Sequence, residues 1–146
     1  MADVTWTNWE EMPELRIKFN GGAADSVITL NWENTIRVAL GATYTASDNL
    51  DLHFGYAYDE SPIPNAEARS PRIPDSDRHW LTIGGSYRVS ENATLDISYA
   101  HLIVKDANVA KLAGAGIADE DFFRGSLTGS YEADVDILSA SFNWRF

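Results

Sequence analysis

Residues 41–57 read GATYTASDNLDLHFGYA, and residues 84–100 repeat the pattern 43 positions later as GGSYRVSENATLDISYA, without a gap. In each copy apolar and polar residues alternate on both sides of a polar triplet, SDN or SEN. Such alternation is typical of β-strands, whose side chains point to opposite faces in turn. Asn and Asp suit the triplet because they tolerate left-handed backbone. The repeat therefore predicts two β-hairpins, and repeated hairpins predict an antiparallel up-and-down meander.

The same alternation predicts strands at 31–45, 50–59, 79–89, 95–103 and 138–146. A first strand is expected within 4–19, although Pro13 interrupts it. The last strand ends on the apolar stripe Phe142, Trp144 and Phe146, but Asp134 and Asp136 would fall on the same face. Only about nine residues of that strand are therefore expected to sit in lipid. The predicted fold class is all-β, an antiparallel up-and-down meander of about six strands.

Composition narrows the class of protein further. The chain has 146 residues, 45% of them hydrophobic, which suits one ordered domain. Its formal net charge of −11 argues against a nucleic-acid partner, and the absence of cysteine excludes disulfides and thiolate metal sites. No apolar run has the roughly 18–20 residues that a transmembrane helix needs, and residues 1–4 do not begin a signal peptide.

Alternation alone also fits a soluble sandwich or a lipocalin-like barrel. Three features favour an outer-membrane β-barrel instead. Short polar turns alternate with long connections at 20–30, 60–77 and 106–129, and the chain ends on an aromatic strand. Aromatic residues also gather near strand ends on the apolar face, namely Tyr44, Tyr56, Tyr58, Tyr87, Tyr99 and Trp144.

This pattern predicts the partners and the orientation. The apolar face would meet membrane lipid and lipopolysaccharide, and the outer-membrane assembly machinery would recognise the terminal Phe146. Because short turns lie on the periplasmic side of such barrels, the C-terminus is expected in the periplasm.

Residues 59–64 (DESPIP) and 71–81 (PRIPDSDRHWL) resemble the segment DxSPxP…IPDxDRxWL of long-chain fatty acid transporters of the FadL type. Residues 36–41 (IRVALG) and 143–146 (NWRF) are similar to that family as well. The resemblance covers essentially all of the chain but only the C-terminal third of the family's length. It implies a barrel plugged by an N-terminal hatch that imports hydrophobic molecules. Residues 1–146 are thus expected to be the C-terminal segment of a barrel, without the hatch and upstream strands.

Arg78 is the sharpest candidate for ligand binding, together with Trp80. Both are expected on the lumen face at the outer end of their strand. There the guanidinium would pair with a fatty acid carboxylate while the indole covers the alkyl chain. Alternatively, Arg78 pairs with Asp75 or Asp77 and only holds the proline-rich segment 61–74 in place.

Two further groups of residues are candidates. Phe122 and Phe123, in the connection 106–129 with its apolar stretch 113–118, would gather greasy substrates; alternatively, this connection forms a short helix on the barrel rim. Six polar residues are expected to face the lumen and to pair with one another into a wet interior. They are Glu33, Arg37, Asp51, His53, Arg88 and Asp96.

No pattern in the chain indicates an enzyme, a metal site or a cofactor. His53, His79 and His101 have no metal-ligand spacing, and no nucleophile or base stands out. The resemblance implies passive uptake of long-chain fatty acids or other hydrophobic molecules across the outer membrane. A small structural or adhesive barrel and a soluble lipocalin-like binder remain the alternatives.

Overall fold

The computed structural model describes residues 1–22, 25–114, 116 and 119–146. Its regular structure is β, apart from one turn of 3-10 helix, η1 (Trp9–Glu11). None of the helical residues described forms a segment long or apolar enough to cross a membrane. The strands are β1 (Ala2–Thr7), β2 (Glu14–Ile17), β3 (Ser26–Thr29), β4 (Thr35–Ser47), β5 (Leu50–Asp59), β6 (Arg78–Ser90), β7 (Ala93–Val104), β8 (Ala107–Lys111), β9 (Leu127–Tyr131) and β10 (Asp134–Trp144).

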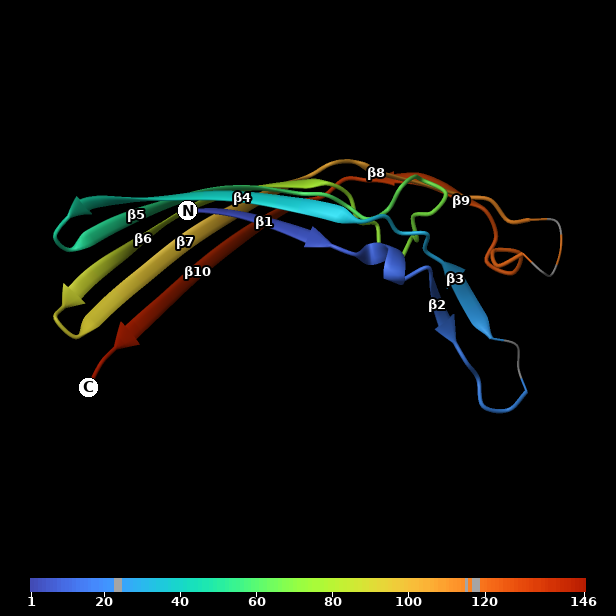
Figure 1. Ribbon diagram of the computed structural model, residues 1–146, viewed down its shortest axis with the longest axis horizontal. Helices are drawn as coiled ribbons and strands as arrows, with labels where there is room; N and C mark the ends of the chain where they lie inside the picture. The colour runs from blue at the N-terminus through green and yellow to red at the C-terminus, as the bar shows by residue number, and fades with distance from the viewer. Residues whose placement is uncertain (23–24, 115, 117–118) are drawn as a thin grey trace.

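Six of these strands form one antiparallel sheet in the order β1-β4-β5-β6-β7-β10. The predicted all-β meander of six strands is therefore confirmed. Figure 1 shows a single curved layer with β1 and β10 at its edges, and the sheet does not close on itself. The β4–β5 and β6–β7 turns lie at one end, which we call the turn end. The hairpins β2–β3 and β8–β9 extend beyond the other end, which we call the loop end.

The sequence repeat corresponds to the hairpins β4–β5 and β6–β7. Their irregularities repeat too, because the register shifts between Thr45 and Ser47 in one hairpin and between Arg88 and Ser90 in the other. The two turns do not use the left-handed backbone that Asn and Asp tolerate. Among the described residues other than glycine, only Asn31 has a positive φ, of 48°. Each turn is thus flanked by a bulge, whose extra residue increases the local twist of the hairpin.

The first predicted strand is divided in the structure. Ala2–Thr7 pairs with β4, whereas residues 14–17 pair with β3 in a separate ladder. Pro13 lies at the division because it has no N–H for the ladder. Its carbonyl oxygen instead accepts hydrogen bonds from the backbone N–H groups of Leu30 (2.9 Å) and Asn31 (3.3 Å). The connection predicted at 20–30 therefore contains strand β3.

The connection predicted at 106–129 contains β8 and the start of β9, which pair with each other. The short helix considered for it is absent from its described part, and residues 115, 117 and 118 of the stretch 113–118 lie outside the described residues. The last strand is also longer than predicted. It begins at Asp134 and pairs with β7 along its whole length. Asp136 does not stop the ladder because its carboxylate accepts hydrogen bonds from Tyr99 Oη and His101 Nδ1.

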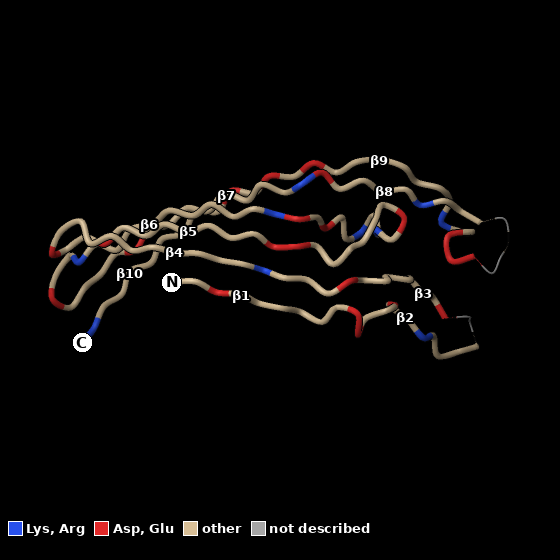
Figure 2. The backbone as a smooth tube through the Cα atoms, turned by 45° about the horizontal axis from the view of Figure 1, so that its top comes forward, with Lys and Arg blue, Asp and Glu red and all other residues tan. Residues whose placement is uncertain are grey.

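Large apolar side chains on the six-stranded sheet are mostly exposed on one face, as Leu40 (56%) and Ile83 (51%) illustrate. An exposed apolar band of this size is expected where a sheet meets lipid. In Figure 2 the charged residues gather toward the two ends of the strands. Buried apolar residues occur mainly near the loop end, where the connections meet, as Leu30, Ile63, Leu102, Ala107 and Val109.

Candidate functional site

The face opposite the apolar band, which we call the inner face, carries a row of polar residues at the loop end. Residues that pair directly across neighbouring strands share a face. Arg37 of β4 pairs with Thr5 of β1 and with Asp59 of β5, and Asp59 pairs with Arg78 of β6. Trp80 lies one row nearer the turn end, opposite Ala57. Sheet pairing thus brings two arginines and an aspartate from three strands into one line.

The segment 60–77 meets this row and encloses an inner pocket of about 310 Å³. Apolar groups come from Trp9 and Trp32, whose rings meet edge to face at 5.2 Å, and from the proline-rich segment. The pocket combines aromatic and aliphatic walls with charged groups, as sites for amphipathic ligands commonly do. Its lining residues are Thr5, Thr7, Trp9, Trp32, Thr35, Arg37, Asp59, Glu60, Pro62, Ile63, Ile73, Asp75 and Arg78.

Arg78 contacts two acidic residues in this pocket. Its Nε lies 3.1 Å from Asp59 Oδ2, and its Nη2 lies 3.3 Å from Asp75 Oδ1. The contact with Asp75 joins β6 to the segment 60–77, which is the arrangement expected if Arg78 holds that segment. The approach to Asp59 is not aligned for a hydrogen bond, so Arg78 Nε is buried without a hydrogen-bond partner in the described structure. The same is true of Trp80 Nε1.

Arg37 differs from Arg78. It is half-buried in the same pocket, but within the described residues it has no acidic oxygen within 4.0 Å. A half-buried guanidinium that lacks a partner favours binding of an anion, especially a carboxylate. Arg37 is therefore the group of this pocket most available to a ligand's carboxylate.

Hydrogen bonds fix the segment 60–77 over the pocket. Arg69 is only 8% exposed and donates to two backbone carbonyl oxygens, of Asp75 (3.0 Å) and of Asn108 in β8 (2.5 Å). On the opposite side, the exposed Glu33, which precedes β4, donates its backbone N–H to Pro62 O at 2.8 Å. The segment is thus bound to both flanks of the loop end.

The other predicted lumen residues lie on the inner face nearer the turn end. His53 contacts Thr43 Oγ1 (3.0 Å) and Ser86 Oγ (3.1 Å) through its two ring nitrogens. Asp51 accepts from Thr45 Oγ1, and Asp96 accepts from Asn143 Nδ2 at 2.8 Å.

The predicted pairing of the lumen charges with one another is wrong. In the part of the chain that the structure describes, Glu33, Arg37, Asp51, His53, Arg88 and Asp96 make no ion pairs among themselves. Asp51, His53 and Asp96 are hydrogen-bonded instead to neutral Thr, Ser or Asn side chains of the same or neighbouring strands. Arg88 is exposed in a polar pocket of about 320 Å³ that Arg145 also lines.

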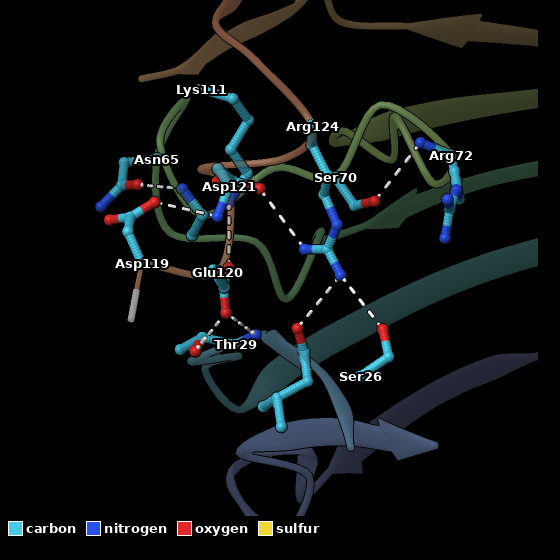
Figure 3. A network of polar contacts seen from close by, with 12 residues as sticks. Ser26, Thr29, Asn65, Ser70, Arg72, Lys111, Asp119, Glu120, Asp121 and Arg124 are labelled. Carbon is cyan, nitrogen blue, oxygen red and sulfur yellow. Dashed lines mark hydrogen bonds and ion pairs between the residues drawn. The ribbon is translucent and has the colours of Figure 1, made fainter. Parts of the chain in front are cut away.

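Phe122 and Phe123 lie on the turn 119–124 between β8 and β9 and do not line the inner pocket that contains Arg78. Their rings meet edge to face at 4.9 Å, and Phe123 is 84% exposed. Figure 3 shows that this turn contacts β3 through Glu120 and Arg124. Backbone N–H groups of Gly114, Asp121 and Phe122 hold the pKa of Asp119, in the same turn, below its ordinary value. The structure therefore separates the aromatic candidates from the arginine candidates.

Sequence reasoning did not identify several contributors to these sites. Trp32 falls within the strand predicted at 31–45, but it precedes β4 and lines the inner pocket together with Trp9 of η1. Arg69 donates hydrogen bonds to backbone carbonyl oxygens, and because every residue has a carbonyl group, the sequence contains no pattern that predicts these contacts. The His79 and His101 rings instead contact Tyr56 Oη and Asp136 on the outer face. No group of three His, Cys, Asp or Glu side chains suited to a metal is found among the described residues.

Residues 1–146 match the family described as outer membrane protein transport protein (OMPP1/FadL/TodX). The chain belongs to this family. It is 38% identical to the long-chain fatty acid transport protein of Escherichia coli O6:H1, over 98% of this chain and 30% of that protein. It is 31% identical to outer membrane protein P1 of Haemophilus influenzae, over 97% of this chain and 30% of that protein.

A solved FadL homologue from Pseudomonas aeruginosa superposes with a TM-score of 0.83 at 28% identity, covering 98% of this chain and 31% of that one. The chain thus spans about a third of the length of the FadL-family relatives it matches. The resemblance noted in residues 59–81 is confirmed, and with it membership of a family of outer-membrane transport proteins. The six-stranded sheet is a part of the family's barrel wall that does not close within these residues.

Proposed function

We propose that this chain forms the C-terminal part of an outer-membrane barrel that takes up hydrophobic molecules passively, with long-chain fatty acids as the first candidate. The observation that carries the proposal is the inner pocket, where the unpaired Arg37 lies beside Trp9 and Trp32. Family membership supports transport rather than an adhesive barrel or a soluble binder. The open edges of β1 and β10 support further strands, because unpaired backbone groups are costly in lipid.

A fatty acid would place its carboxylate against Arg37 at the end of the pocket nearest the sheet. Its alkyl chain would lie against Trp9, Trp32 and Ile63 and pass toward Trp80. Arg78 would hold Asp75 and thereby fix the segment 60–77. Because Arg78 lies in the same cross-strand row as Arg37, it also places positive charge near the ligand's carboxylate. Phe122 and Phe123, exposed at the loop end, would offer a first contact to greasy molecules.

A neutral hydrophobic ligand is the second candidate. The pocket is lined by three acidic residues, Asp59, Glu60 and Asp75, against two arginines. This excess of negative charge disfavours an anion unless Arg37 contacts it directly. The two candidates therefore differ in whether Arg37 contributes to binding.

We also propose the orientation of the chain. The short turns and Phe146 would face the periplasm, where the assembly machinery recognises the terminal strand, and the loop end would be extracellular. Two aromatic belts on the outer face support this placement between membrane lipid and lipopolysaccharide. One belt holds Tyr44, Tyr87 and Trp144 near the turn end, and the other holds Trp6 and Tyr56 nearer the loop end.

The test uses the protein expressed from its complete reading frame and purified in detergent. Binding of a fluorescent long-chain fatty acid and of its methyl ester is measured for the parent, Arg37→Gln and Arg78→Ala. Since a hydrogen bond to a charged group contributes about 1.5–3 kcal/mol, Arg37→Gln should weaken fatty acid binding about ten- to a hundredfold. Binding of the ester should hardly change.

Arg16→Gln, at an exposed ion pair on the β2–β3 hairpin, is the matched control and should leave both affinities unchanged. Equal loss of acid and ester would assign Arg37 a purely structural role and favour neutral ligands. A parent protein that binds neither probe would contradict uptake of hydrophobic molecules. Unchanged affinity in Arg78→Ala, with segment 60–77 disordered, would limit Arg78 to holding that segment.

A further inference from the structure

The turn 119–124 and strand β3 are joined by polar contacts across the loop end (Figure 3). Glu120 Oε2 accepts two hydrogen bonds from Thr29, one from the backbone N–H and one from Oγ1, both at 2.9 Å. Arg124 Nη2 donates to Ser26 Oγ and to Val27 O, both at 3.3 Å. We call these contacts between Ser26–Thr29 and the turn 119–124 the latch.

The latch joins elements attached to opposite edges of the sheet. The hairpin β2–β3 lies in the chain between β1 and β4, at one edge, and β8–β9 lies between β7 and β10, at the other. The segment 60–77, which covers the inner pocket, is bonded to β8–β9 through Arg69 and through Tyr131 Oη, which donates to Pro71 O. The latch thus connects segment 60–77, which covers the inner pocket, through β8–β9 to the hairpin β2–β3 at the opposite edge of the sheet.

The contacts of the latch can break without unfolding of the sheet. Its contacts come from exposed or half-exposed polar side chains, and no fully buried apolar residue belongs to it. Such contacts are individually weak, and regions that depend on them open locally far more often than a strand ladder does. Internal ion pairs keep Glu120 and Arg124 extended toward β3. Lys111 Nζ lies 4.0 Å from Glu120, and Arg124 Nη1 lies 3.4 Å from Asp121.

From this geometry we infer that Glu120 and Arg124 are positioning residues that control access to the inner pocket by holding the turn 119–124 against β3. Neither residue lines that pocket. With the latch closed, β2–β3, segment 60–77 and β8–β9 form one connected cover over the loop end. With the latch released, the turn and the part of segment 60–77 that is bonded to β8–β9 move apart from β3 and open the pocket, while the hydrogen bond from Glu33 to Pro62 keeps the start of the segment in place. The inference rests on the proposed uptake of hydrophobic molecules and adds its control.

The first test measures access without relying on transport. Residues 1–146 contain no cysteine, and any cysteine elsewhere in the reading frame is replaced by serine. Thr35→Cys then places the one thiol of these residues in the pocket lining, at a site only 6% exposed. Its labelling by a bulky, membrane-impermeant maleimide is timed in outer membranes of cells expressing the complete reading frame. Adding Glu120→Ala and Arg124→Ala should speed labelling at least tenfold. Equal rates with and without the latch would overturn the inference.

Glu14→Ala with Arg16→Ala is the matched control, because it removes an ion pair of the same hairpin that does not reach the turn 119–124. Its labelling rate should equal that of Thr35→Cys alone. Heat-modifiable gel migration confirms that each variant has assembled. If the variant without the latch does not assemble, the inference is judged by the cross-linking experiment below, in which the latch is held closed.

In the second test, Thr29→Cys and Glu120→Cys are bridged by a short, reducible bis-thiosulfonate. Bridging should lower uptake of a fluorescent fatty acid at least tenfold, and a reductant should restore it. Bridging Arg16→Cys and Asp25→Cys, within the β2–β3 hairpin, should leave uptake unchanged. Full uptake by the bridged latch would overturn the inference. Absence of uptake before bridging would instead contradict the proposed function. In that case the labelling rates of the first test would still show whether the latch controls access to the pocket.

Discussion

The two ends of this molecule are stabilised in different ways. Along β4 to β7 the strands are joined by long backbone ladders that shift register only beside the short turns, and the large side chains of one face point away from the protein. At the loop end, β2–β3, segment 60–77 and β8–β9 are joined by particular side chains, such as Glu120 to Thr29 and Arg69 to Asn108. The strands β4 to β7 depend on the alternation of apolar and polar residues, whereas the loop end depends on individual side-chain contacts.

This difference decides what each region tolerates. In the ladder region, the face on which a residue lies matters more than its identity, because lipid accepts apolar groups and a wet interior accepts polar ones. At the loop end, a single lost donor leaves backbone carbonyl groups without a partner. Substitutions in the strand ladders and substitutions at the loop end should therefore differ in how much they destabilise the protein and in how far the effect spreads.

The largest effect is expected from a charge on the outer face. Ile83 lies near the middle of β6 and is 51% exposed on the apolar face. Ile83→Arg should destabilise the assembled protein by about 2–4 kcal/mol, because the guanidinium must enter the hydrocarbon. Urea unfolding in lipid vesicles, followed by tryptophan fluorescence, measures this change.

Thr82→Arg, one residue away on the inner face, is the matched control and should shift stability by only about 0.5 kcal/mol. Equal costs for the two arginines would mean that Ile83 does not face lipid, and the contrast between the two faces would fail.

A smaller and more local effect is expected at the loop end. Arg69→Ala removes the donor to Asp75 O and Asn108 O, and leaving such buried carbonyls unpaired costs about 1–3 kcal/mol. Segment 60–77 should become sensitive to protease while the urea midpoint of the barrel stays unchanged. Arg72→Ala, at an exposed arginine of the same segment, should have neither effect. A shift of the urea midpoint in Arg69→Ala would show that the loop end and the ladder unfold as one unit.

The same contrast explains how far the sequence predicted the structure. The hairpins of residues 41–57 and 84–100 were predicted because a ladder with lipid on one side imposes strict alternation. Arg78 and Trp80 could be assigned to one face from parity alone, and their shared face follows from the register. The contact of Arg78 with Asp75 was among the alternatives because the two residues are close in the chain.

The loop end was not predictable in this way. The ladders β2–β3 and β8–β9 are short, and Pro13 interrupted the alternation that would have shown the first of them. The contacts of Glu120 and Arg124 join residues more than 90 positions apart through side-chain length, which has no periodic signature. Asp136 misled the prediction of the last strand because its partners, Tyr99 and His101, lie on another strand.

The smallest expected effect concerns acid and the turn 119–124. Hydrogen bonds from the backbone N–H groups of Gly114, Asp121 and Phe122 hold the pKa of Asp119 below its ordinary value of 3.8. A carboxyl group with a lowered folded-state pKa stabilises the fold fully above its ordinary pKa, and this contribution is lost as the pH falls through the folded value. The turn should therefore keep its structure from neutral pH down to about pH 5 and loosen progressively below pH 4.

Hydrogen exchange of peptides covering residues 119–126, corrected for the intrinsic pH dependence, measures this loosening. Asp119→Asn should exchange faster at neutral pH and should show no further change with acid, since it has no proton to gain. Peptides from β6 and β7 should stay protected in both proteins, because their ladders do not depend on this carboxylate. Acid-induced exchange that appears equally in β6 would mean that the two ends of the molecule are not independently stabilised.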